Sequence, residues 1–164
     1  MLRRFPFVLA AQMLISTQVM AEEIPAKLAV PAEAKLLGKY AAKGVQIYTC
    51  TTKGAANEWT FKAPEAVLAD ARGQTFAKHY AGPSWEAGDG SKIVGKVMAT
   101  EPAPKAAAIP WLLLSAESSG NGVLAGARYV QRINTSGGVG PTGACVSAGA
   151  EERIDYTADY VIYR

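Results

Sequence analysis

Metal-binding residues are scarce in this sequence, which has one histidine, His79, and two cysteines, Cys50 and Cys145. Structural zinc sites take four Cys and His ligands, so these residues are too few to build the common ones. A metal at His79 would need carboxylates as its other ligands. The cysteines are not spaced as C-x-x-C, the usual redox motif. We therefore expect neither a metal nor another cofactor.

The chain also lacks an excess of charge of one sign, with 17 Lys and Arg residues against 14 Asp and Glu residues. Two of the basic residues lie in the leader predicted below, and removing them from 17 leaves 15. Proteins that bind nucleic acid have a concentrated basic face, and the charges of this chain are nearly balanced. No nucleic-acid partner is therefore expected. No strand–GxGxxG–helix unit is present to hold a nicotinamide cofactor.

No apolar run is long enough to span a membrane, because the stretch from Phe5 to Ile15 has about half of the roughly 20 residues required. Two arginines precede this stretch, and Val19 and Ala21 supply the short side chains that signal peptidase accepts at the −3 and −1 positions. These features are typical of a secretory signal peptide. We predict cleavage after Ala21, export to the periplasm or the extracellular space, and one mature domain over 22–164 without a membrane span.

Export would place the two cysteines in an oxidising compartment, where thiols usually pair as disulfides. We predict a Cys50–Cys145 disulfide that closes a loop over most of the domain. In the chain-entropy model such a loop stabilises the fold by about 4–5 kcal/mol.

The mature sequence is dominated by β-strand patterns. Asp89-Gly90 between two strand segments is a strong hairpin signal. In the last segment, residues 154, 156, 158, 160 and 162 share one face, because side chains alternate along a strand. The predicted strands cover 45–51, 58–62, 74–80, 84–86, 91–99, 109–116, 123–134 and 153–163. Many short strands and little helix predict a mainly β fold, a single antiparallel sandwich or barrel.

Two segments have helical patterns. Residues 31–43 begin with a proline suited to a first helical turn, contain helix-forming residues, and are followed by Gly44 as a stop signal. We predict one short N-terminal helix there. Residues 64–71 could form a single further helical turn.

A set of motifs resembles a family of secreted bacterial and fungal proteins catalogued as a domain of unknown function, number three-four-five-five. The resemblance covers roughly Ala29 to the C-terminus and implies export and one all-β domain, but no established activity. Some fungal relatives carry a malate dehydrogenase label, which the missing cofactor motif argues against here. The motifs are G-x-Q-I-Y-x-C at 44–50, Trp59, HYAGPSWE at 79–86, DGS at 89–91, IPWLL at 109–113, VQRINT-x-GG at 130–138, Cys145 and Y-x-ADY at 156–160.

The segment from His79 to Ser91 is the richest in chemically capable side chains, and it supplies most of the candidate ligand-binding residues. An aromatic platform with carboxylates beside it would suit a glycan, since aromatic faces cover C–H bonds and carboxylates take hydroxyls. Arg132, ahead of a glycine-rich stretch, could bind an anion. The competing interpretation is structural, with Trp85 in the core and the glycines in turns. The candidate residues are His79, Tyr80, Trp85, Glu86, Asp89 and Arg132.

The leading hypothesis is a non-catalytic exported module that binds a glycan or another small polar ligand. One alternative is a hydrolase in which His79 works with nearby carboxylates. For glycoside hydrolysis, the paired carboxylates could be Glu86 or Asp89 with Glu117, Asp155 or Asp159. Another is a structural envelope protein. A cavity holding His79 and a carboxylate would favour the enzyme, exposed coplanar aromatic rings the glycan module, and buried Trp85 and His79 without a cleft the structural protein.

Overall fold

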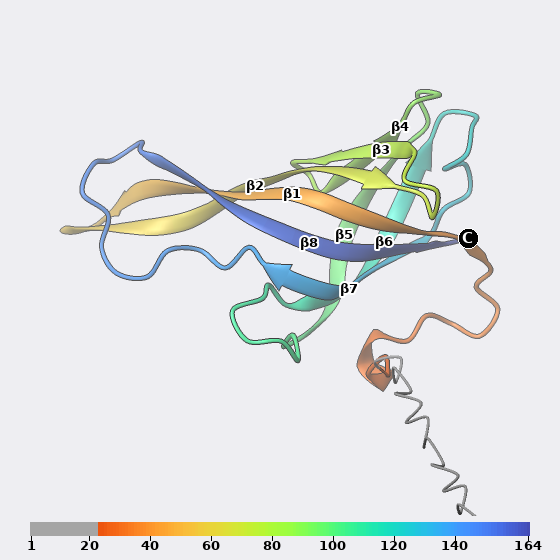
Figure 1. The fold of residues 1–164 in the computed structure, drawn as a ribbon, viewed down its shortest axis with the longest axis horizontal. Coiled ribbons are helices and arrows are strands. Elements are labelled where there is room, and N and C mark those ends of the chain that lie inside the picture. Colours follow the sequence, from red (N-terminus) through yellow and green to blue (C-terminus); the bar gives the residue numbers. More distant parts are fainter. Residues whose placement is uncertain (1–22) are drawn as a thin grey trace, which may run out of the picture.

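The structure, a computed structural model, describes residues 23–164; the predicted signal peptide lies outside them. One 3-10 turn, η1 (Ala26–Leu28), precedes eight antiparallel strands (Figure 1). The prediction of a mainly β antiparallel fold is confirmed. The strands are β1 (Leu36–Lys53), β2 (Ala56–Ala69), β3 (Thr75–Tyr80), β4 (Ser84–Ala87), β5 (Lys92–Glu101), β6 (Trp111–Ser119), β7 (Tyr129–Gly137) and β8 (Glu151–Tyr163).

All eight strands belong to one sheet in which neighbours in sequence are neighbours in space. The first strand also pairs with the last, from Leu36 opposite Tyr163 to Thr49 opposite Glu151. This pairing closes the sheet into a barrel. Closure gives every strand two neighbours, although β2 pairs with β3 only over 66–69 and β5 pairs with β4 only over 92–94, so the rest of these two strands is paired mainly on one side.

Alternation along each strand sends one set of side chains into the interior of the closed sheet. In β8, Tyr156, Ala158, Tyr160 and Ile162 are buried, which is the face predicted from the sequence. They join a core that includes Leu68, Trp85 and Val130. The interior is therefore filled by apolar side chains over much of its length.

The helix predicted over 31–43 is wrong, because β1 begins at Leu36 and continues without a break to Lys53. Helix propensities differ by only tenths of a kcal/mol per residue, and tertiary pairing easily outweighs them. Here β8 supplies a ladder of backbone hydrogen bonds and the core buries Ala42. Gly44, interpreted as a helix stop, instead lets two strands approach closely, since a Cβ there would overlap the backbone of Ala66.

The helical turn predicted over 64–71 is also wrong, because residues 64–69 belong to β2, which pairs with β1 and then with β3. Its buried residues are Pro64, Ala66 and Leu68, which is the period of two expected of a half-buried strand. Alanines lie at buried and at outward-facing positions of this segment, so the alternation between the two faces is not visible in the sequence.

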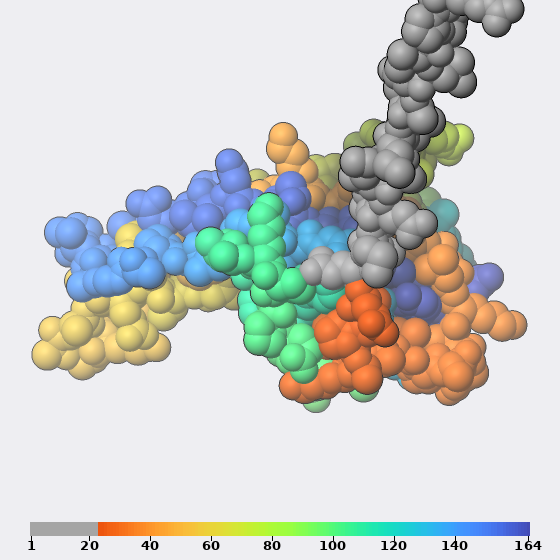
Figure 2. All heavy atoms as spheres, turned by 60° about the horizontal axis from the view of Figure 1, so that its bottom comes forward, coloured from red at the N-terminus to blue at the C-terminus, as the bar shows by residue number. Residues whose placement is uncertain are grey.

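A second, smaller core lies on the outer face of the sheet, where the segment around η1 packs against β6, β7 and β8. Leu28 is fully buried there with Trp111 and Val161. Gln131 donates from Nε2 to the Leu28 carbonyl at 2.7 Å, and Lys27 pairs with Glu101 at 3.0 Å. Figure 2 shows this segment in orange-red beside the green connector that follows β5.

The predicted disulfide joins Cys50 in β1 to Cys145 in the loop over 138–150, with 5.8 Å between their Cα atoms. Both cysteines are buried. The loop and the tip of the β1–β2 hairpin project together from one end of the molecule (Figure 2). The disulfide therefore ties a glycine-rich loop to the long hairpin that extends beyond the barrel.

Replacing both cysteines, Cys50→Ser with Cys145→Ser, is expected to lower the free energy of unfolding by about 4–5 kcal/mol, because the bond closes a loop of 95 residues. Chemical denaturation of the mature protein measures this loss. Val146→Ser is a matched control, since Val146 is exposed beside Cys145. Equal stability of the double variant and the control would contradict the prediction.

Candidate functional site

A cavity of about 390 Å³ occupies one part of the barrel interior. Its lining residues come from all eight strands, and the turn between β3 and β4 closes one side through Gly82 and Pro83. The volume lies within the range of small-molecule pockets. The interior of an eight-stranded barrel can be filled by side chains or can hold one small ligand. In this barrel, core side chains fill one part of the interior and the cavity occupies the other part.

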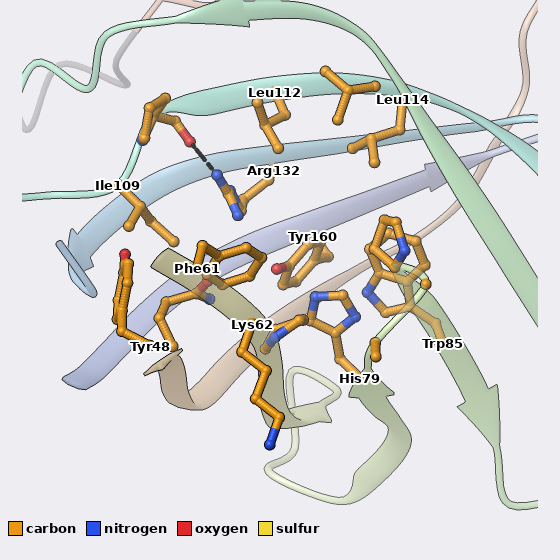
Figure 3. Close-up of a pocket in the computed structure, with 17 residues that line it drawn as sticks. Tyr48, Phe61, Lys62, His79, Trp85, Ile109, Leu112, Leu114, Arg132 and Tyr160 are labelled. Carbon is orange, nitrogen blue, oxygen red and sulfur yellow. Dashed lines mark hydrogen bonds between the residues drawn. The ribbon is translucent and has the colours of Figure 1, made fainter. Parts of the chain in front are cut away.

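Most of the lining is apolar. Leu112 and Leu114 of β6 form one wall, and Ile109 lies beside them (Figure 3). At the mouth, Phe61 and Val97 line the cavity although they are 55% and 49% exposed. These two exposed side chains place the mouth of the cavity between β2 and β5.

The cavity borders the filled core at a cluster of three rings. His79 and Trp85 stack with centroids 4.5 Å apart and planes 8° apart. Tyr160 meets both rings edge-on, at 5.1 Å from His79 and 5.4 Å from Trp85. All three rings are buried and line the cavity. Their packing fixes the rigid inner surface on which a bound molecule would rest.

His79 is neutral at physiological pH. It is 3% exposed, and this burial lowers the pKa of its imidazole to about 4, although the hydrogen bond to Ser84 opposes the shift. Its Nδ1 lies 2.9 Å from the Ser84 carbonyl oxygen, which can only accept. Nδ1 therefore carries the proton, and Nε2 keeps a lone pair as a hydrogen-bond acceptor.

Arg132 brings a positive charge to the cavity from β7. Its guanidinium points into the space between Ile109 and Tyr160 (Figure 3). Nε and Nη2 both donate to the Pro110 carbonyl oxygen, at 3.1 and 2.9 Å. Burial raises the pKa of Tyr48 and of Tyr160, and the nearby positive charge of Arg132 partly offsets this rise.

No carboxylate lines the cavity within the part of the chain that the structure describes. The other charged lining residue, Lys62, pairs with Glu151. Arg132 forms no ion pair with any residue of 23–164. The inside of the cavity is therefore apolar with one positive charge that no acidic side chain balances.

Two buried polar atoms of the lining residues have no hydrogen-bond partner in the described structure, Nε2 of Gln46 and Nε1 of Trp85. Both are N–H donors. A buried donor without an acceptor costs about 1–3 kcal/mol, so such atoms call for an explanation. Both lie on residues that surround the cavity, where a bound molecule could supply the missing acceptors.

The loop after β7 supports one wall of the cavity. Tyr48 donates its hydroxyl hydrogen to the Gly138 carbonyl at 2.7 Å. A side chain at Gly140 would collide with the Tyr48 ring, so the loop passes directly over it. The same loop is tied to β1 by Cys145. The disulfide thus helps to hold Tyr48 in the cavity wall.

The structure brings together only three of the six candidate residues. His79, Trp85 and Arg132 line the cavity. Tyr80 and Glu86 alternate with them and project from the outer face, where the Tyr80 hydroxyl donates to Glu86 at 2.6 Å. Lys92 lies over the Tyr80 ring, 5.2 Å from its centroid. These outer residues are therefore separated from the cavity by the sheet itself.

Asp89 has a structural role at the turn between β4 and β5. Its carboxylate accepts from Ser91 Oγ at 2.6 Å and from the Val123 amide at 2.8 Å. These hydrogen bonds, chiefly that from Ser91, hold the pKa of Asp89 below its usual value. The carboxylate fastens the loop after β6 to this turn.

Sequence reasoning did not propose several residues of the cavity, among them Gln46, Tyr48 and Phe61. A signal for the first two exists in the alternation Gly44, Gln46, Tyr48, Cys50, which places a glutamine on the same face as a buried cysteine. Buried polar side chains on a core-facing position are informative because they need a partner. Phe61 carries no such signal.

The family model described as "Protein of unknown function (DUF3455)" matches residues 31–164. The chain therefore belongs to this family, as the sequence motifs predicted. Searches of curated proteins and of solved structures each gave no match.

Within 23–164, no three side chains of His, Cys, Asp or Glu gather as ligands for a metal ion. The same residues include no helix of the length and apolarity that crossing a membrane requires.

The single histidine allows a direct test of its burial. With a pKa of about 4 in the folded state against about 6.5 when unfolded, the unfolded chain takes up a proton that the folded chain does not. Folding stability should therefore fall as the pH drops from about 6.5 to 4, with about 3 kcal/mol lost through this group.

NMR of the untagged mature protein checks this prediction, since His79 gives the only imidazole resonances. These signals should stay constant from pH 8 to about 5. A titration centred near pH 6.5 would contradict the buried, neutral ring.

Proposed function

We propose that this protein is an exported, non-catalytic module that takes one small, mainly apolar molecule into its barrel cavity. The observation that carries the proposal is the cavity itself, about 390 Å³ in volume and open at a mouth lined by Phe61 and Val97. Pockets of this kind bind by burying apolar surface, while a few fixed polar groups orient the ligand.

This proposal changes the ligand expected from the sequence. A glycan module would present exposed aromatic faces, but Trp85 is 1% exposed and stacks on His79 inside the barrel. Apolar side chains form most of the cavity wall. A polar sugar would leave many hydroxyl groups without partners there, whereas an apolar body would not.

The other two hypotheses receive less support from the geometry. A hydrolase using His79 needs a carboxylate or a nucleophile within hydrogen-bond reach, and no carboxylate of residues 23–164 lines the cavity. A purely structural protein would bury His79 and Trp85 against other side chains without a cleft. Instead, both rings face an opening of ligand size.

The exported location remains part of the proposal. It rests on the signal-peptide pattern of residues 1–21 and on the disulfide between Cys50 and Cys145, a bond that persists mainly in oxidising compartments. Such a module would carry or sequester its ligand outside the cytoplasm.

A neutral fluorescent probe tests the proposal. N-phenyl-naphthylamine is apolar and brightens when it leaves water, so it should bind the mature protein with one-to-one stoichiometry. Val97→Trp, which places a large ring at the mouth, is expected to weaken binding at least about tenfold. Val97 is half exposed, so the substitution does not overfill the core.

Met98→Trp provides the matched control, because Met98 adjoins Val97 on β5 and is 58% exposed but does not line the cavity. This variant should bind the probe as the unmodified protein does. Absence of saturable binding, or equal loss in both variants, would overturn the proposal.

A further inference from the structure

We infer that the molecule bound in the cavity is an amphiphilic anion whose carboxylate docks on Arg132. The inference rests on the proposed function and adds the chemical class of the ligand: a carboxylic acid with an apolar body. Three observations support it. The guanidinium has a fixed orientation, no acidic side chain of residues 23–164 balances its charge, and the cavity wall has unpartnered hydrogen-bond donors.

The guanidinium is held in one orientation by the Pro110 carbonyl. Nε–H and one N–H of Nη2 form one edge of the guanidinium fork, and both donate to this oxygen. A guanidinium has five N–H donors; Arg132 also interacts with the Tyr160 hydroxyl, which leaves hydrogens on the edge formed by Nη1 and Nη2 for a further acceptor. That edge matches the two oxygens of a carboxylate.

The acceptor that orients Arg132 is itself fixed. Thr135 donates from Oγ1 to the Ile109 carbonyl at 2.6 Å, and the Ile109 amide donates to the Gly137 carbonyl at 2.9 Å. The segment carrying Pro110 is therefore anchored to β7, the strand that also carries Arg132. A group held in place before binding loses little conformational entropy when the ligand arrives.

Charge and hydrogen-bonding capacity favour the same ligand. No acidic residue of 23–164 pairs with Arg132 or lines the cavity, so this half-buried cation lies at the edge of a mainly apolar space without an acidic partner. The unpartnered polar atoms of the wall, on Gln46 and Trp85, are donors as well. A carboxylate is negatively charged and only accepts hydrogen bonds, which complements all three groups.

The test compares decanoate with decanol, two ligands with the same ten-carbon chain that differ in the head group. Isothermal titration is carried out at neutral pH and below micelle-forming concentrations, with displacement of N-phenyl-naphthylamine as a second readout. The unmodified protein should bind decanoate about ten- to a hundredfold more tightly than decanol, as expected for charge-assisted hydrogen bonds.

Arg132→Met keeps the length of the side chain and removes the charge. This variant should lose the preference for decanoate, while saturable binding of decanol and the neutral probe shows that the cavity has formed. Arg128→Met is the control, because Arg128 is exposed just before β7 and does not line the cavity. It should keep the full preference.

Each other result overturns the inference. Equal affinity of the unmodified protein for both ligands would show that the head group is not recognised, while decanol and probe binding would leave the proposed function standing. Loss of both ligands in Arg132→Met would make Arg132 a structural residue. Absence of binding by decanol, decanoate and the neutral probe alike would remove the proposed function together with the inference.

Discussion

Pairing between the first and the last strand is the constraint on which the rest of the structure depends. Because β1 lies between β2 and β8, the sheet closes, and alternate side chains of every strand converge on one interior. His79 of β3, Arg132 of β7 and Tyr160 of β8 are distant in sequence and share a cavity for this reason alone. Without closure, the same side chains would lie on the face of an open sheet.

The same constraint explains where the sequence was informative and where it was not. Alternation in β8 is evident from residues 154–162, because large apolar and aromatic side chains alternate there with polar ones, and the structure buries that face. Residues 36–43 are rich in alanine, lysine and leucine, which favour a helix locally. They form a strand because they pair with β8. A local sequence pattern does not reveal this pairing with a strand at the other end of the chain.

The candidate site, too, could be predicted only in part from the sequence. Composition around residues 79–91 pointed to His79 and Trp85, and the arginine of a glycine-rich segment pointed to Arg132. The sequence did not show that Tyr80 and Glu86 face outward, because the direction of alternation depends on which face the closed sheet buries. The apolar walls contributed by Phe61 and Leu112 could not be distinguished from ordinary core residues, since only the strand order makes them neighbours of a cavity.

The central claim is that an acidic amphiphile enters the barrel beside Trp85. Its most direct test is a ¹H–¹⁵N NMR titration with decanoate that follows the tryptophan indole N–H signals. Nε1 of Trp85 and Nε1 of Trp111 are both buried without a partner in the described structure, but Trp85 lines the cavity, whereas Trp111 packs with Leu28 on the outer face. We predict a large saturable shift of the Trp85 signal and little change at Trp111. An unmoved Trp85 signal at saturating decanoate would contradict the account.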